Sequence, residues 1–369
     1  MKIVMKKIVL AGVILGVLSC SGGKKTVDLG FIGGLSGGNA DLGEAGRNGA
    51  IMAVEEVNEA GGIKGRQVKL IVKDDNNRPE KAREVAEELV GLEVEAIIGP
   101  LTSTTTKAAI EVTNEAQMVV ASPTASAIQL AGIDDYLIRV CPSSRDNAFS
   151  YGVFMYDKLG FRKVSIVADG QNRVFSESWY GEFKSKWEEK GGEILIVEFV
   201  NTKEFSEYHV LTEKLLAGGP DGILFIANSV DSARLAQQIR KEDKDITFVA
   251  AEWAATQNLI SLGGAAVDGL VSMQIVNFFD TSPRFLNFVA AYEERFGNYP
   301  SFSSIISYDA AMMVMKALEL QGKESLKESI LMNQPFEGLQ MELGIDEYGD
   351  LLGQSTFVVV ENREYALYR

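Results

Sequence analysis

Apolar and polar positions alternate in blocks along most of this chain. Short apolar runs bounded by Gly or Pro are typical of buried strands, and they occur at residues 27–32, 67–73, 96–99, 118–122, 163–168, 194–199, 222–227, 247–251 and 269–274. The stretches between them are amphipathic, most clearly residues 79–90, whose apolar side chains share one helical face. Strands that alternate with helices predict an α/β fold with parallel sheets flanked by helices. Such sheets bind ligands beyond the carboxyl ends of their strands.

The alternation occurs twice, over residues 27–140 and again over residues 161–251. About 350 residues follow the amino-terminal segment, which is too long for one typical core, so we expect two domains. Residues 139–145 contain turn residues without periodicity and are predicted to cross between the domains. The tail departs from the alternation, and its predicted strands are residues 336–343, 356–360 and 364–368.

Two strand-to-helix junctions carry clusters of hydroxyl groups. Residues 96–110 and 118–130 each begin as an apolar run, break into Ser, Thr and Pro, and resume as a helical pattern. The amino end of a helix offers unpaired N–H groups and partial positive charge, which suit a carboxylate. Two such loops side by side form a plausible ligand cradle. The alternative is ordinary N-capping by Ser and Thr.

The first residues have the pattern of an export signal. Lys2, Lys6 and Lys7 precede the apolar run 8–18, which is too short to span a bilayer. The sequence Leu18-Ser19-Cys20 that follows resembles a lipobox, the signal of bacterial lipoproteins. The resemblance implies a signal peptide over residues 1–19 and a tether over residues 20–25, with Cys20 lipidated and holding the protein to a membrane. The alternative is a plain secretory signal with an incidental Cys.

Composition excludes several classes of function. The formal charge is −15, or about −18 without the three signal lysines, and this acidity argues against a nucleic-acid partner. Cys141 is the one cysteine besides Cys20, and His209 is the single histidine, expected to be half-exposed on a helix over residues 204–216. These counts exclude a Cys-based metal site, a multi-His metal site and a His-dependent triad. Residues 33–43 are Gly-rich but match no phosphate or dinucleotide fingerprint, so no cofactor is predicted.

Several short motifs in order along the chain carry a resemblance to a known family. They are Gly34-Leu35-Ser36-Gly37, Gly61-Gly62-Ile63-Lys64-Gly65, Asp74-Asp75, Pro79, Gly99-Pro100-Leu101-Thr102-Ser103, Ser122-Pro123-Thr124, Glu252 and Tyr308-Asp309-Ala310. Together they resemble type I periplasmic binding proteins, and most closely the branched-chain amino acid binding proteins of ABC importers. The resemblance implies two α/β lobes, three interlobe crossovers and a ligand in the cleft. Lobe one would hold residues 26–141 and 275–353, and lobe two residues 142–274 and 354–369.

The resemblance also implies roles for individual residues. The loop with Thr102 and Ser103 would hold an amino acid's α-carboxylate, and Thr124, Ala125 and Ser126 would contact both α-groups. Glu252, directly after the strand at residues 247–251, would hold the α-ammonium, and Tyr308 would line the cleft. A zwitterion that leaves water needs both charges matched, because an unpaired buried charge costs several kcal/mol. The alternative for Glu252 is a solvated loop residue.

At the positions facing the ligand side chain, the sequence departs from the family pattern. Leu42 replaces an aromatic residue, Phe175-Ser176 replaces the usual Tyr-Gly, and an aromatic residue is missing near Asn228 and Ser229. Trp253 follows Glu252, and with Phe175 it favours a larger or aromatic ligand side chain. The alternative for both rings is packing in the core or at the cleft rim.

The combined prediction is a lipid-anchored extracytoplasmic receptor that captures an amino acid with an aliphatic or aromatic side chain. By the resemblance it would deliver this ligand to an ABC permease, act as a monomer and close its lobes on binding. An enzyme is not expected, because the single histidine lies on a predicted helix and the sequence has no HExxH motif. The rival is a receptor of the same fold for an amide, a urea or another small carboxylate, and a ligand without an ammonium group would not need Glu252.

Overall fold

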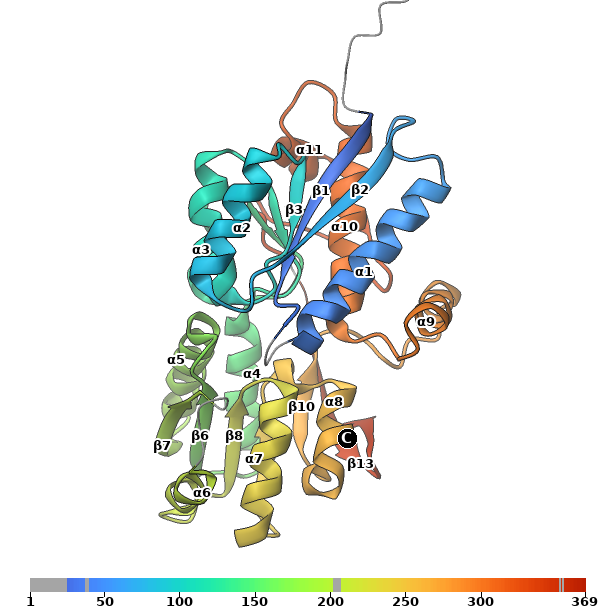
Figure 1. Ribbon diagram of the computed structural model, residues 1–369. Coiled ribbons are helices and arrows are strands. Elements are labelled where there is room, and N and C mark those ends of the chain that lie inside the picture. The colour runs from blue at the N-terminus through green and yellow to red at the C-terminus, as the bar shows by residue number, and fades with distance from the viewer. Residues whose placement is uncertain (1–24, 37–39, 202–206, 352, 354) are drawn as a thin grey trace, which may run out of the picture.

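The computed structural model describes residues 25–36, 40–201, 207–351, 353 and 355–369, and it consists of two α/β lobes, one above the other (Figure 1). The predicted signal peptide and Cys20 lie outside the described residues. Within the described part, no helix combines the length and apolar character needed to cross a bilayer.

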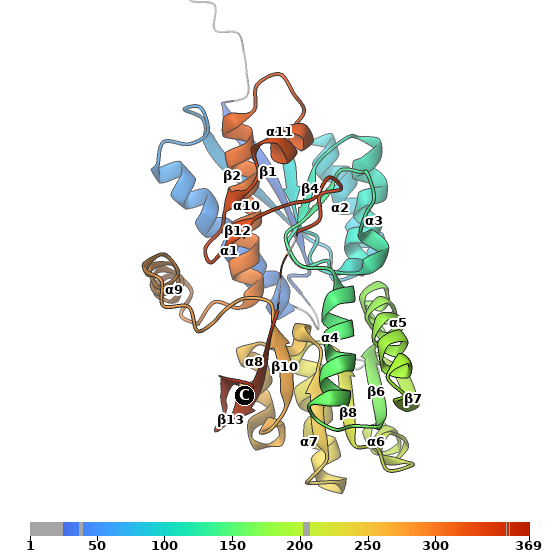
Figure 2. The ribbon, with the colours of Figure 1, turned by 180° about the vertical axis from the view of Figure 1, so that it is seen from behind.

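Lobe one is built on a parallel five-stranded sheet with the order β2-β1-β3-β4-β5. Its first segment consists of β1 Thr26–Gly33, α1 Ala40–Glu59, β2 Gln67–Asp74, α2 Pro79–Gly91, β3 Ala96–Ile98, α3 Ser103–Glu115, β4 Val120–Ser122 and β5 Leu137–Arg139. A later segment of the chain returns to it with α9 Pro283–Phe296, α10 Phe302–Leu320, α11 Leu326–Asn333, β11 Phe336–Glu337 and β12 Glu342–Leu343. The longest helices, α1 and α10, pack side by side, and α9 stands beside α1 (Figures 1 and 2).

Lobe two is built on a seven-stranded sheet with the order β14-β13-β10-β9-β8-β6-β7. Its strands β6 to β10 run parallel, and β13 and β14 add an antiparallel edge. The elements are α4 Ser144–Asp157, β6 Lys163–Asp169, α5 Arg173–Glu189, β7 Glu193–Val200, α6 Tyr208–Leu216, β8 Gly222–Ile226, α7 Ser229–Glu242, β9 Thr247–Ala250, α8 Gln257–Gly263, β10 Val271–Gln274, β13 Thr356–Glu361 and β14 Glu364–Leu367.

The amphipathic pattern explains how the helices cover the sheets. Helix α2 starts at Pro79. Proline has no backbone N–H, but the first residues of a helix have no intrahelical acceptor for one, so no hydrogen bond is lost. Arg78, before it, is extended. Its predicted apolar face is buried, and Leu89 packs so closely on β1 that a Cβ at Gly30 would lie 2.8 Å from Leu89 Cδ1. The sheet and helix therefore meet at this distance only because residue 30 has no side chain.

The chain passes between the lobes three times: after β5, after β10 and before β13. Figure 2 shows the last passage, where the carboxy-terminal segment descends to β13. The predicted fold class is therefore correct. The exact lobe boundaries, at residues 141/142, 274/275 and 353/354, stay a prediction.

Three details of the sequence prediction need correction. The structure has a short strand, β5, that the pattern did not predict. It pairs with β4 and ends at Arg139, whose side chain is buried. Residues 336–343 form a hairpin of β11 and β12 rather than one strand. The helix predicted over 204–216 begins at Tyr208, with residues 202–206 outside the described part, and the side chain of His209 is 68% exposed beside Glu213.

Candidate ligand-binding site

A cavity lies between the lobes, at the carboxyl ends of their parallel strands. We call it the inner cavity, and it is lined by Leu42, Leu101, Thr124, Ser126, Cys141, Pro142, Asn147, Asn172, Phe175, Glu252, Trp253, Ile275 and Phe302. Both lobes and two of the crossovers contribute to this wall. Six predicted site residues therefore line one cavity, namely Leu42, Thr124, Ser126, Phe175, Glu252 and Trp253, and their contact with a ligand stays a prediction.

The first hydroxyl loop caps α3 and binds lobe two. Thr102 is the N-cap, and its Oγ1 accepts from Thr105 N at 3.3 Å, as in ordinary capping. The amide of the residue before Thr105, Thr104 N, donates to Asn172 Oδ1 of lobe two at 3.1 Å. These donors of the helix end are therefore occupied by protein groups, and neither Thr102 nor Ser103 lines the inner cavity. Ser103 Oγ instead accepts from Ala127 N at 3.2 Å and so holds the second loop.

The second hydroxyl loop presents Thr124 and Ser126 to the inner cavity. The prediction that a helix follows it was wrong: after Ala127 the chain makes only a single 3-10 turn. The guanidinium of Arg139 holds this loop, because it donates to the carbonyls of Ala127 at 3.0 Å and Ala125 at 3.5 Å. The Ser126 carbonyl, which would accept from Leu130 N in an α-helix, accepts instead from Ser144 N at 2.7 Å. Leu130 N donates to the Ala127 carbonyl at 3.1 Å, which closes the single turn. Ala125 itself is fully buried behind the wall.

Glu252 is the one carboxylate that lines the inner cavity among the described residues. It follows β9 and is 5% exposed. Trp179 Nε1 donates to its Oε2 at 3.0 Å, while its Oε1 has no hydrogen-bond partner in the described part of the chain. Burial raises the pKa of the Glu252 carboxyl, and the nearby Asn147 amide opposes this. An ionised carboxylate left in this state is costly, so a cation in the inner cavity would be strongly favoured.

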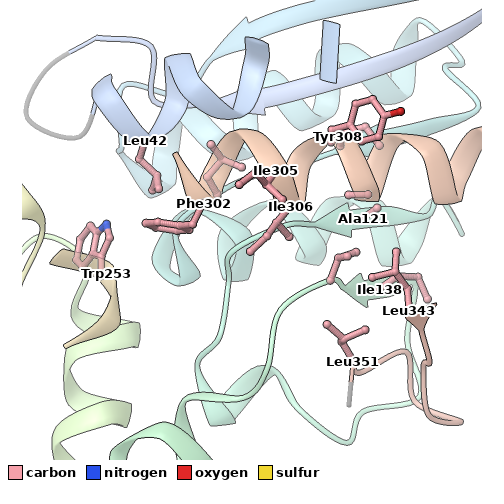
Figure 3. Close-up of a cluster of buried hydrophobic side chains, with 14 of the residues drawn as sticks. Leu42, Ala121, Ile138, Trp253, Phe302, Ile305, Ile306, Tyr308, Leu343 and Leu351 are labelled. Atoms are coloured by element: carbon pink, nitrogen blue, oxygen red, sulfur yellow. The ribbon is translucent and has the colours of Figure 1, made fainter. Parts of the chain in front are cut away.

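Aromatic and aliphatic side chains form another part of the wall. The rings of Phe175 and Trp253 meet edge to face with centroids 5.5 Å apart. Figure 3 shows Leu42 and Phe302 from lobe one pointing toward Trp253 of lobe two. These residues suit an apolar ligand side chain.

Some predicted site residues lie elsewhere. Tyr308 is on α10, where its hydroxyl donates to Glu56 Oε2 at 2.5 Å, and Figure 3 shows it well away from Trp253. Asn228 caps α7, and its Oδ1 accepts from Asp231 N at 2.9 Å. Ser229 lies outside the inner cavity and donates to Asp41 Oδ2 of lobe one at 3.1 Å. None of Tyr308, Asn228 and Ser229 lines the inner cavity.

Sequence reasoning missed several wall residues, which are Leu101, Cys141, Pro142, Asn147, Asn172, Ile275 and Phe302. Pro142 and Ile275 lie on crossovers, which a reader of the sequence could have suspected. Phe302 is the first residue of α10. Its spacing is that of a core residue, so the sequence pattern did not indicate that it lines a cavity.

The wall offers binding groups rather than reactive ones. Burial raises the pKa of the Cys141 thiol to about 12, so it stays protonated and unreactive. In the described part of the chain, no group of three or more His, Cys, Asp or Glu side chains is placed to hold a metal ion.

Hydrogen bonds join the lobes on both sides of the inner cavity. On one side, Thr104 Oγ1 accepts from Val174 N at 3.2 Å, next to the contact with Asn172. On the other side, Asp41 Oδ2 accepts from Ser229 and from Asn258 Nδ2, the latter at 3.2 Å. The structure therefore has its lobes in contact across the cleft.

A periplasmic binding protein family model matches residues 26–350. The chain belongs to this family. A leucine-, isoleucine-, valine-, threonine- and alanine-binding protein of Pseudomonas aeruginosa is 24% identical over 351 residues, covering 94% of this chain and 93% of that protein. A Leu/Ile/Val-binding protein homologue of Brucella abortus is 25% identical over 358 residues, covering 94% of each chain.

Solved structures share the fold. A leucine-binding protein from Thermotoga maritima superposes with a TM-score of 0.85 at 24% identity, covering 93% of this chain and 98% of that one. A solute-binding protein from R. palustris, crystallised with benzoate, has a TM-score of 0.83 at 17% identity, covering 93% and 95%. These relatives are binding proteins, not enzymes.

Proposed function

We propose that this protein is an extracytoplasmic receptor that binds an α-amino acid and delivers it to an ABC importer. The observation that carries the proposal is the buried Glu252 carboxylate with one unpartnered oxygen in the inner cavity. An α-ammonium group supplies both the missing positive charge and the missing hydrogen-bond donor. The ligand carboxylate would face Thr124 and Ser126, with Ser103 holding their loop through Ala127.

The ligand side chain would lie against the apolar wall. Leu42, Phe302 and Trp253 favour an aliphatic or aromatic side chain, and the absence of Lys and Arg from the described wall disfavours an acidic one. Amino-acid binding in the Pseudomonas and Brucella relatives supports this reading. The benzoate bound by one structural neighbour keeps a small carboxylate as the rival ligand. A small carboxylate would not neutralise the negative charge of Glu252, and the two like charges would repel each other.

A thermal-shift screen tests the ligand class, because a bound ligand raises stability by mass action. The panel contains the standard amino acids, their N-acetyl derivatives, benzoate and urea. We expect free amino acids with apolar side chains to raise Tm and their N-acetyl derivatives to have no effect. Stabilisation by benzoate or urea alone would support the rival.

The substitution Glu252→Gln then tests the charge. It keeps the shape and removes one partner of a desolvated ion pair, which typically costs about 2–5 kcal/mol, or on the order of 30- to several-thousand-fold in affinity. Because burial already raises the pKa of this carboxyl, the ligand-free variant should be at least as stable as the wild type. Glu87→Gln, on the exposed face of α2, is the matched control. Binding by the Glu252 variant within about twofold of wild type would refute the amino-acid proposal.

Lipid anchoring is the second part of the proposal, and Cys20 carries it. The change Cys20→Ala should move the protein from the detergent phase to the aqueous phase without changing ligand affinity, because Cys20 precedes the lobes in sequence. Equal partitioning of wild type and variant into the aqueous phase would exclude the anchor.

A further inference from the structure

A second and larger cavity lies beside the inner one. We call it the outer cavity, and it has a volume of about 650 Å³. Leu42, Trp253 and Phe302 line both cavities, so these side chains form the partition between them (Figure 3). The rest of its wall comes from the start of α1, the α8 region, α9 with the segments on either side of it, and β14, together with Ser229 and Gln274. Besides the partition residues, Ser229 is the one predicted ligand contact in this wall.

Aromatic rings form much of the outer wall. Phe278, Phe279, Tyr299 and Tyr365 line it together with Trp253. Phe279 is 42% exposed and Tyr299 43% exposed, so this aromatic surface is partly open to solvent. The rings of Phe278 and Tyr299 are tilted at 53° with centroids 6.1 Å apart. The face of an aromatic ring attracts a cation through its quadrupole.

The charges on the outer wall all have one sign. Asp41, Glu44 and Glu364 line the outer cavity, and no Lys, Arg or His does so in the described part of the chain. Asp41 accepts hydrogen bonds from Ser229 and Asn258, whereas Glu44 and Glu364 are exposed and form no ion pair with another described residue. A cleft with one sign of charge concentrates ions of the opposite sign.

Gln274 supplies an independent indication of a ligand. It is the last residue of β10, is 5% exposed, and lines the outer cavity. Its Nε2 has no hydrogen-bond partner in the described part of the chain. A buried donor left without an acceptor is costly, so a hydroxyl or carbonyl oxygen in the outer cavity would be favoured.

We propose that the outer cavity is a second binding site, which takes a small organic ammonium ion bearing a hydroxyl or carbonyl oxygen. The ammonium group lies among the rings and the carboxylates of Glu44 and Glu364, and the oxygen accepts from Gln274. This proposal does not depend on the ligand of the inner cavity, because it rests on a different set of walls. Leu42, Trp253 and Phe302 are the residues common to the two walls.

Calorimetry with choline tests the charge requirement. The control probe is 3,3-dimethylbutan-1-ol, which has the same shape and hydroxyl but no charge. We expect the mature chain to bind choline at least fivefold more tightly than the neutral alcohol. Equal affinity for the two probes, or binding of neither, would overturn the proposal.

Variants locate the site. Glu44→Gln combined with Glu364→Gln should weaken choline at least fivefold, and Tyr299→Leu about two- to fivefold. Gln274→Met should weaken choline but leave tetramethylammonium, which lacks the hydroxyl, unchanged. Glu87→Gln controls for a general loss of negative charge and should leave choline binding unchanged.

The variant Glu252→Gln separates the two cavities. It should leave choline affinity unchanged even though it removes the charge of the inner cavity. Loss of choline binding in this variant, with no loss in the Glu44 and Glu364 double variant, would place choline in the inner cavity and refute the outer site. Failure of the amino-acid proposal leaves these choline measurements unaffected, so the two proposals fail separately.

Discussion

Replacing Arg139 should show how the second ligand loop is held. Arg139 is 1% exposed, and its Nε donates to Asp350 Oδ1 at 2.6 Å. The same guanidinium donates to the carbonyls of Ala125 and Ala127, which flank the cavity-lining Ser126. One buried side chain therefore ties the ligand loop to a segment more than two hundred residues later in the chain.

The cost of Arg139→Met can be worked from these contacts. Breaking a buried ion pair by removing one partner costs about 3–5 kcal/mol, and each buried carbonyl left without a donor adds about 1–3 kcal/mol. Asp350 is 15% exposed and still accepts from Gly132 N at 2.8 Å, and the contact of Arg139 with the Ala125 carbonyl is long. The low end of the range for a broken ion pair therefore applies. We expect a loss of about 3 kcal/mol, or roughly 6–12 °C in Tm for a lobe of this size.

Urea unfolding and calorimetry measure this loss, with Arg83→Met as the matched control. Arg83 pairs with Glu111 on the surface, where both side chains are about half-exposed, so its loss should cost at most about 1 kcal/mol. Ligand affinity of the Arg139 variant should fall about 3- to 10-fold, because the loop holds its binding geometry only part of the time. If Arg139→Met is no less stable than Arg83→Met, the loop is not held in this way.

Three further predictions concern lobe contact and titration. Ser229→Ala removes a hydrogen bond that Asp41 receives only when the lobes meet, so the inner-cavity ligand should bind about 2- to 10-fold more weakly by calorimetry; unchanged affinity would contradict this. The raised pKa of Glu252 predicts proton release when an ammonium ligand binds at pH 5, which appears as a dependence of the binding enthalpy on the buffer; identical enthalpies in two buffers would argue against ion pairing there. Burial raises the pKa of Asp309 to about 7 from 3.8, so the folded state holds the proton more tightly and its contribution to stability is lost as pH rises from about 4 to 7. Asp309→Asn should flatten that decline in urea unfolding, and an unchanged pH profile would show that Asp309 does not cause it.

Local pattern alone determined most of the architecture. The apolar runs at residues 27–32 and 163–168 became β1 and β6, and the apolar face of residues 79–90 became the buried face of α2. These features depend on which side chains are buried away from water. Apolar residues spaced by two in a strand, or by about 3.6 in a helix, indicate the buried face directly. The order of motifs likewise placed Glu252 at the end of a strand, where the structure shows it lining the inner cavity.

Only the tertiary structure decided which side chains reach the cavities. Phe302 lines both cavities, whereas Tyr308, on the same helix and equally apolar in pattern, bonds to Glu56 inside lobe one. The second hydroxyl loop lacks its predicted helix because the Ser126 carbonyl accepts from Ser144 N at the crossover rather than from Leu130 N. Such choices depend on partners brought together by the crossovers, and the energies of those contacts exceed the local preferences that a sequence pattern reports.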